Sequence, residues 1–131
     1  MGFEPRDSEL RESEEHDLGP LTGYPEGTPL AVKVGHRQVV LVRDRDQVYA
    51  LRDVCPHQGA QLSAGRVIST CRLRQRGDRW VQTDQRAVQC PWHGWAFGLE
   101  DGRALFGSGR VRVRSYSIRV DDGRVRVRVE Q

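Results

Sequence analysis

Short runs of apolar and β-branched residues, separated by turn residues, make up most of the chain from residue 30 onward. The runs at 30–34, 38–42 and 48–51 are divided by glycine or by charged residues. Runs of this length with such boundaries are typical of β-strands. We therefore expect the structure to be β over this region.

The C-terminal part of the sequence predicts a β-hairpin with one defined register. Asp-Gly at 122–123 is a strong signal for a two-residue loop. With that loop, Val120 faces Val125 and Ile118 faces Val127, while arginines occupy the opposite face. The turn chemistry and the alternation agree on this register. The full sets are Tyr116, Ile118, Val120, Val125, Val127 and Val129 on one face and Arg119, Arg124, Arg126 and Arg128 on the other.

Two further hairpins are expected. A loop at 101–102 would pair Leu99 with Ala104 and Phe97 with Phe106. A loop at 77–78 would give another hairpin, with one apolar and one basic face. Cys71 would lie on the apolar face, and we interpret it as a structural thiol and not as a metal ligand. The apolar face would hold Cys71, Leu73 and Trp80, and the basic face Arg72, Arg74, Arg76 and Arg79.

The charge is unevenly distributed along the 131 residues, whose formal net charge is +3. Residues 1–20 contain seven acidic and two basic residues, a net charge of −5, so the rest carries +8. Few apolar side chains occur there, and we expect a flexible acidic tail at 1–20 followed by one domain at 21–131. The arginine-rich strands are interpreted as a solvated sheet face, with docking of an acidic partner as the alternative. No motif for binding nucleic acid occurs.

The three cysteines suggest a reducing compartment. An odd number does not suit a disulfide scaffold. The first residues lack the layout of a signal peptide, and no apolar stretch reaches the length of a membrane span. We therefore expect a cytoplasmic location without a membrane partner, where cysteines more often bind metal or react than form bridges.

Two loops combine cysteine, histidine and glycine. Residues 55–60 read CPHQGA and residues 90–95 read CPWHGW. Two thiolates and two imidazoles suit iron or zinc. In the first loop only a proline separates Cys55 from His57, which is awkward for ligating one zinc ion. Two adjacent irons remove the difficulty, because the cysteine and the histidine of a loop then bind different ions.

These motifs resemble those of Rieske [2Fe–2S] proteins, specifically the small ferredoxin-like members and the cluster domains of ring-hydroxylating oxygenases. The similarity covers residues 55–65 and 90–97 most closely. It implies an all-β, antiparallel sandwich with a small cluster-binding subdomain and one [2Fe–2S] cluster. It also implies that Cys55 and Cys90 hold the inner iron and that His57 and His93 hold the outer one.

Two departures from the family pattern affect the expected function. Thirty-two residues separate His57 from Cys90, and we interpret the excess as a hairpin insertion at 69–86. Trp95 stands where respiratory members carry a hydroxyl-bearing residue that raises the potential. We therefore expect a low-potential cluster.

The resemblance implies an electron carrier that passes single electrons from a reductase to an oxygenase or a similar terminal enzyme. The alternatives are a tightly bound Rieske subunit of a larger enzyme, such as a nitrite reductase small subunit or an oxygenase component, and a zinc-stapled β module with a binding role. A complete catalytic site is not expected. A mononuclear iron centre needs two histidines and a carboxylate, and only His16 and His36 remain outside the two loops.

Overall fold

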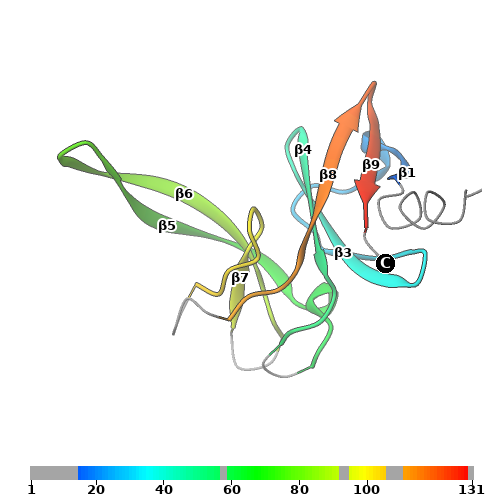
Figure 1. The fold of residues 1–131 in the computed structure, drawn as a ribbon, viewed down its shortest axis with the longest axis horizontal. Helices are drawn as coiled ribbons and strands as arrows, with labels where there is room; N and C mark the ends of the chain where they lie inside the picture. Colours follow the sequence, from blue (N-terminus) through cyan, green and yellow to red (C-terminus); the bar gives the residue numbers. More distant parts are fainter. Residues whose placement is uncertain (1–14, 57–58, 92–94, 106–110, 130–131) are drawn as a thin grey trace, which may run out of the picture.

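A computed structural model of the chain describes residues 15–56, 59–91, 95–105 and 111–129 (Figure 1). Its regular elements are strands and two three-residue 3-10 helices, and the strands pair only in the antiparallel sense. The described part of the chain holds no helix long and apolar enough to cross a membrane. The strands are β1 Glu15–Pro20, β2 Leu30–Val34, β3 Arg37–Asp44, β4 Gln47–Arg52, β5 Arg66–Arg76, β6 Arg79–Gln89, β7 Ala96–Gly98, β8 Ser115–Asp121 and β9 Arg124–Arg128; the helices are η1 Leu21–Gly23 and η2 Leu62–Ala64.

The strands form two sheets. Six strands pair in the order β1-β9-β8-β4-β3-β2, and three in the order β5-β6-β7. In the larger sheet, β4 and β8 are paired only through Ala50 and Leu51. Strands on either side of this short junction contribute side chains to one shared core. The expected all-β antiparallel fold is confirmed.

Strand β3 lies between two hydrophobic cores. Its alternating side chains Val39 and Leu41 point into the sheet core, whereas Val40 and Val42 point into the loop core. This burial on both faces explains the continuous apolar run in the sequence. The sheet core consists of Val34, Val39, Leu41, Val48, Ala50, Tyr116, Val125, Val127 and Val129; the loop core consists of Val40, Val42, Leu51, Cys55, Leu62, Val88, Cys90, Phe97, Leu99 and Val113.

Two of the three predicted hairpins have the expected loops. In the β8–β9 hairpin Val120 pairs with Val125 and Ile118 with Val127. Its loop residues at 122–123 have φ angles of 54° and 76°, as a type I′ turn requires. In the β5–β6 hairpin Arg76 pairs with Arg79 across the loop at 77–78.

The register predicted around 101–102 is wrong. Ala104 pairs with Phe97 instead of Leu99. The side chain of Leu99 is buried in the loop core, and its N–H donates to the carbonyl of Arg86 on β6. Gly102 has a φ of 75°, and a Cβ there would lie 2.1 Å from the carbonyl oxygen of Val113. Tertiary packing therefore lengthens the loop, and Phe106, the other expected partner, lies outside the described residues.

The last six residues of the flexible tail expected at 1–20 are ordered. Residues 15–20 form β1, which pairs with β9 at the edge of the larger sheet. Arg119 donates two hydrogen bonds, of 2.9 and 3.1 Å, to the carboxylate of Glu15, and Arg124 donates one of 2.9 Å to Asp17. Part of the arginine-rich face is thus paired with acidic residues of the same chain. Residues 1–14 lie outside the described part.

Strand β1 is expected to loosen in acid. The hydrogen bonds from Arg119 lower the pKa of Glu15, and those from Arg124 and the Gly19 amide lower the pKa of Asp17. A carboxyl group with a lowered pKa in the folded state stabilises the fold above its unfolded pKa, and this contribution disappears as the pH falls through the folded value. The protection of β1 amides against hydrogen exchange, relative to the intrinsic rate at each pH, should therefore fall below about pH 4.

The variant Glu15→Gln/Asp17→Asn tests this assignment. Its β1 amides should exchange faster than those of the wild type at pH 7 and should lack the acid-dependent step. Asp122→Asn removes an exposed carboxylate from the β8–β9 turn and serves as the control that keeps wild-type exchange. An acid step that persists in the double variant would assign the effect to other groups.

Candidate metal centre

The first cysteine loop follows β4. The Cys55 side chain is fully buried. Its backbone N–H donates to the carbonyl of Ala60, and its carbonyl accepts from Gly59 N–H, both at 2.7 Å. These two hydrogen bonds hold the ends of the loop together and turn the thiol into the loop core.

The second cysteine loop connects β6 to β7. Gln89 and Ala96 are paired in the two strands on either side of it. The Cys90 N–H donates to the carbonyl of Trp95 at 2.6 Å. The donor and acceptor are five residues apart, as they are in the bond from Cys55 to Ala60. Two loops that are distant in sequence thus share the same closing hydrogen bond.

The fold brings the two thiols into one core. Cys55 and Cys90 are both free of disulfides and both belong to the loop core. The other two predicted ligands, His57 and His93, lie outside the described residues. Within the described part, no group of three or more His, Cys, Asp or Glu side chains is gathered in a way that could hold a metal ion.

Asp53 fixes the segment that returns from the first loop. Among the described residues, Asp53 is the one charged residue that is buried, with an exposed fraction of 3%. Its carboxylate accepts hydrogen bonds from the N–H and the hydroxyl of Ser63 at 2.7 and 2.6 Å, while its own N–H donates to the carbonyl of Gln38 on β3. The loop around Cys55 is therefore closed twice, at Ala60 and again at Ser63.

Gly65 joins the first loop segment to the second. A Cβ at this position would lie 1.7 Å from the carbonyl oxygen of Gln89, the residue before Cys90. Only glycine allows this approach without a shift of the backbone. The end of η2 is thus packed directly against the start of the second loop.

Trp95 packs beside the loop core. Its ring stacks on that of Phe97, with centroids 6.3 Å apart and an angle of 25° between the planes. Phe97 is fully buried, and Trp95 is partly buried against the same core. Such stacking shields the interior from water at the side of the second loop.

Cys71 differs from the interpretation as a structural thiol. It is exposed, on the part of the β5–β6 hairpin that extends beyond β7, which pairs with β6 only over Ala87–Gln89 in the described residues. The sequence pattern identified an apolar face correctly but could not show whether anything packs on it.

The described residues around Cys55 and Cys90 fit a metal–sulfur centre. Two unbridged thiols are held in an apolar core by loops that backbone hydrogen bonds close. Such surroundings keep bulk water away from a redox centre. Asp53, Ser63 and Gly65 position these loops and were not identified as site residues from the sequence. Ser63 and Gly65 lie inside the 55–65 motif, whereas nothing in the sequence marks Asp53 as buried.

Comparison with known proteins gives a consistent result. The family model of the Rieske [2Fe-2S] domain matches residues 15–117, beginning where β1 begins. The anthranilate 1,2-dioxygenase ferredoxin subunit of Burkholderia cepacia is 30% identical over 117 residues, which are 89% of this chain and 94% of that protein.

Solved structures agree with this match. A protein described as the NADH-dependent nitrite reductase small subunit of Mycobacterium tuberculosis has a TM-score of 0.70 and 28% identity, covering 91% of this chain and 97% of that one. A chain in the complex of reduced oxygenase and oxidized ferredoxin of carbazole 1,9a-dioxygenase has a TM-score of 0.66 and 27% identity, covering 89% and 94%. From its sequence match and its fold, the chain belongs to the Rieske [2Fe–2S] domain family.

Proposed function

We propose that this protein is a ferredoxin-like electron carrier that takes single electrons from a reductase and passes them to an oxygenase-type acceptor. The observation that carries the proposal is the placement of two buried, unbridged thiols, Cys55 and Cys90, in one core by two similarly tied loops. The similarity to a dioxygenase ferredoxin subunit over nearly its whole length supports the choice of acceptor.

The proposed ligands follow from the two motifs. Cys55 and Cys90 hold the inner iron of one [2Fe–2S] cluster, and His57 and His93 hold the outer one. The cluster supplies one-electron chemistry. The protein contributes the thiolates, the tied loops that hold them, and the packing of Trp95 and the loop core that limits access of water.

The midpoint potential should be low. At the position after His93-Gly94, Trp95 has no hydroxyl group to donate a hydrogen bond toward the cluster. Hydrogen bonds to cluster sulfur raise the potential, so the value should lie in the lower part of the Rieske range of about −150 to +300 mV. Redox titration followed by EPR measures it, and a midpoint near the upper end would contradict this role of Trp95.

The carrier function is tested by a single turnover. The protein, reduced with dithionite, is mixed with a Rieske-type terminal oxygenase from its host, and the visible absorption of the cluster is followed. We expect oxidation that slows with added salt, because residues 21–131 carry a net charge of +8 and exposed charges that steer docking are screened. A reduced protein that the oxygenase leaves unoxidised would contradict the proposal.

A second candidate is a permanently bound enzyme subunit. It is favoured by the similarity to the protein described as a nitrite reductase small subunit. A carrier should elute alone from a gel-filtration column in high salt, whereas a fixed subunit should stay with a large subunit. Metal analysis of the same sample separates both from the zinc module, which would contain zinc without acid-labile sulfide.

We also infer a cytoplasmic location. All three cysteines are free, as is usual for proteins of a reducing compartment. Fractionation of the native host, with the protein detected by antibody, tests this inference, and recovery from an extracytoplasmic fraction would contradict it.

A further inference from the structure

The β5–β6 hairpin extends beyond the rest of the molecule as an arm, defined here as residues 69–86 (Figure 1). In the described residues β5 pairs only with β6, and β7 pairs with β6 only over Ala87–Gln89. The arm is therefore a two-stranded ribbon with two free edges. Such a ribbon is marginally stable in water on its own, which suggests that something binds it.

One face of the arm exposes large apolar side chains. Leu73 and Trp80 are 62% and 65% exposed. Leu73 pairs with Gln82 and Gln75 with Trp80, so Leu73 and Trp80 are diagonal neighbours on one face. Tryptophan is enriched at the centres of protein interfaces, and two neighbouring exposed apolar side chains on a projecting ribbon fit such a contact.

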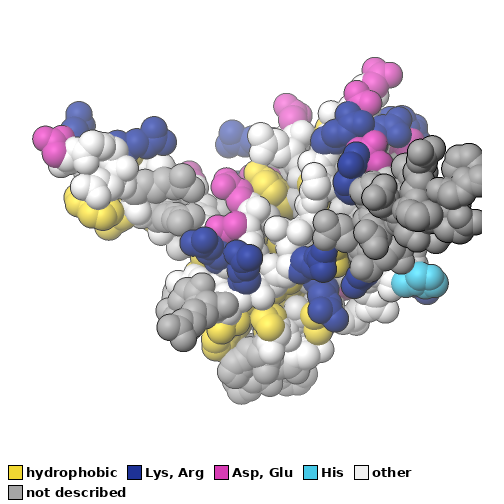
Figure 2. Space-filling view, in the orientation of Figure 1, with side chains coloured by type: hydrophobic (Ala, Val, Ile, Leu, Met, Phe, Trp, Pro, Cys, Tyr) yellow, Lys and Arg dark blue, Asp and Glu magenta, His cyan; other side chains and the backbone are white. Residues whose placement is uncertain are grey.

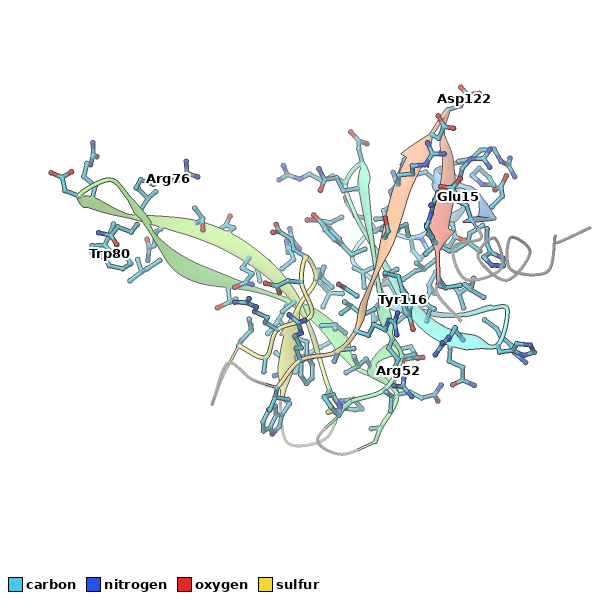
Figure 3. The ribbon with its side chains drawn as sticks, viewed as in Figure 1. Glu15, Arg52, Arg76, Trp80, Tyr116 and Asp122 are labelled. Atoms are coloured by element: carbon cyan, nitrogen blue, oxygen red, sulfur yellow. The ribbon has the colours of Figure 1, made fainter. Side chains whose placement is uncertain are left out.

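The opposite face is basic. Arg76 and Arg79 face each other across the tip and are exposed. Figure 3 shows Trp80 and Arg76 on opposite sides of the ribbon, and Figure 2 shows apolar and basic side chains separated in the same way. Residues 69–86 contain five arginines and two aspartates, a net charge of +3. Like charges in directly opposed positions are destabilising, so a negatively charged occupant would stabilise the arm.

We propose that the arm docks into a cleft of the electron-accepting protein, where an apolar pocket receives Trp80 and Leu73 and carboxylates pair with Arg76 and Arg79. This proposal rests on the proposed function, because it assumes that an acceptor protein exists. The acceptor must contact both faces of the ribbon, since the apolar and the basic groups lie on opposite sides.

Other occupants fit less well. A second copy of the chain would bring the basic faces of two arms together, each with a net charge of +3, and like charges repel. A membrane surface would contact one face only. The chain's own acidic strand β1 lies on the other side of the molecule (Figure 1) and is already paired with Arg119 and Arg124.

The arm should act on affinity and not on the electron-transfer step. Strand β6 runs 11 residues from Arg79 to Gln89, next to Cys90, which at the usual rise per residue is roughly 35 Å. The tip is therefore too far from the thiols to alter the cluster directly. Loss of the docking contact should weaken binding while the midpoint potential and the rate at saturating acceptor stay unchanged.

The test measures binding of the oxidised holoprotein to a Rieske-type terminal oxygenase from its host by calorimetry, and electron transfer by stopped flow. Trp80→Ala should raise the Kd roughly 30-fold, as expected for a tryptophan at an interface centre. Arg76→Glu/Arg79→Glu should also weaken binding and reduce its dependence on salt. The matched controls are Val120→Ala, an exposed apolar residue on β8, and Lys33→Glu on β2, which should keep the wild-type Kd.

The outcomes separate the arm from the carrier function. If the wild type reduces the oxygenase and Trp80→Ala keeps its Kd, the arm proposal is overturned and the carrier function stands. If the wild type binds without passing electrons and Trp80→Ala weakens binding, the arm is a docking element, but the carrier function fails and the assignment of the partner as an electron acceptor fails with it. Absence of wild-type binding, a wild-type dimer that Trp80→Ala dissociates, or binding to phosphatidylserine vesicles in place of the oxygenase would each overturn the docking proposal.

Discussion

Cys55→Ala and Cys90→Ala should each yield a protein without bound iron, acid-labile sulfide or visible colour. Each substitution removes one of the two thiolates proposed for the inner iron, and no other cysteine lies in the loop core to replace it. Iron–sulfur clusters are held by thiolates, so loss of one should prevent assembly rather than merely shift the potential. Iron and sulfide analysis after anaerobic reconstitution measures the effect.

Cys71→Ala is the matched control for these two variants. Its thiol is exposed on the arm, outside both loops, so this variant should keep full iron content and the wild-type EPR signal. Circular dichroism of the apoproteins shows whether Cys55→Ala and Cys90→Ala still fold. Either variant with wild-type iron content would show that its cysteine is not a ligand.

The sequence predicts those parts of the fold in which local turn chemistry and side-chain alternation agree. The β8–β9 hairpin is the clearest example, because the loop at 122–123 and the pairing of Val120 with Val125 require the same register. The cysteine motifs are local too. The structure places Cys55 and Cys90 in one core, whereas the assignment of Cys55, His57, Cys90 and His93 as ligands remains a prediction.

Elements that depend on distant partners were not predicted. Strand β1 has no apolar alternation, and its place in the sheet depends on pairing with β9 and on arginines more than a hundred residues away, such as Arg119 and Arg124. The pairing near Leu99 differs from the prediction for a similar reason. Burial of the Leu99 side chain in the loop core outweighed the local Asp-Gly signal. The burial of Asp53 likewise depends on Ser63, ten residues away.

Gly65→Ala should destabilise the protein and disturb the second cysteine loop. The added Cβ would lie 1.7 Å from the carbonyl oxygen of Gln89, and backbone on both sides leaves no flexible side chain to move aside. Overpacking of this kind costs about 3 kcal/mol or more, so the melting temperature should fall by roughly 10 °C. Because Gln89 precedes Cys90, iron content after reconstitution should fall as well.

Gly23→Ala is the control, since a Cβ at Gly23 would meet no atom within 4 Å and its backbone is not in the left-handed region. It separates the general effect of replacing glycine by alanine from the close approach at Gly65. Equal melting temperatures for Gly65→Ala and Gly23→Ala would show that the approach to Gln89 is not constraining. If Gly65→Ala lost stability but kept full iron content, Gly65 would support the fold without positioning Cys90, and the two loops would be positioned independently of each other.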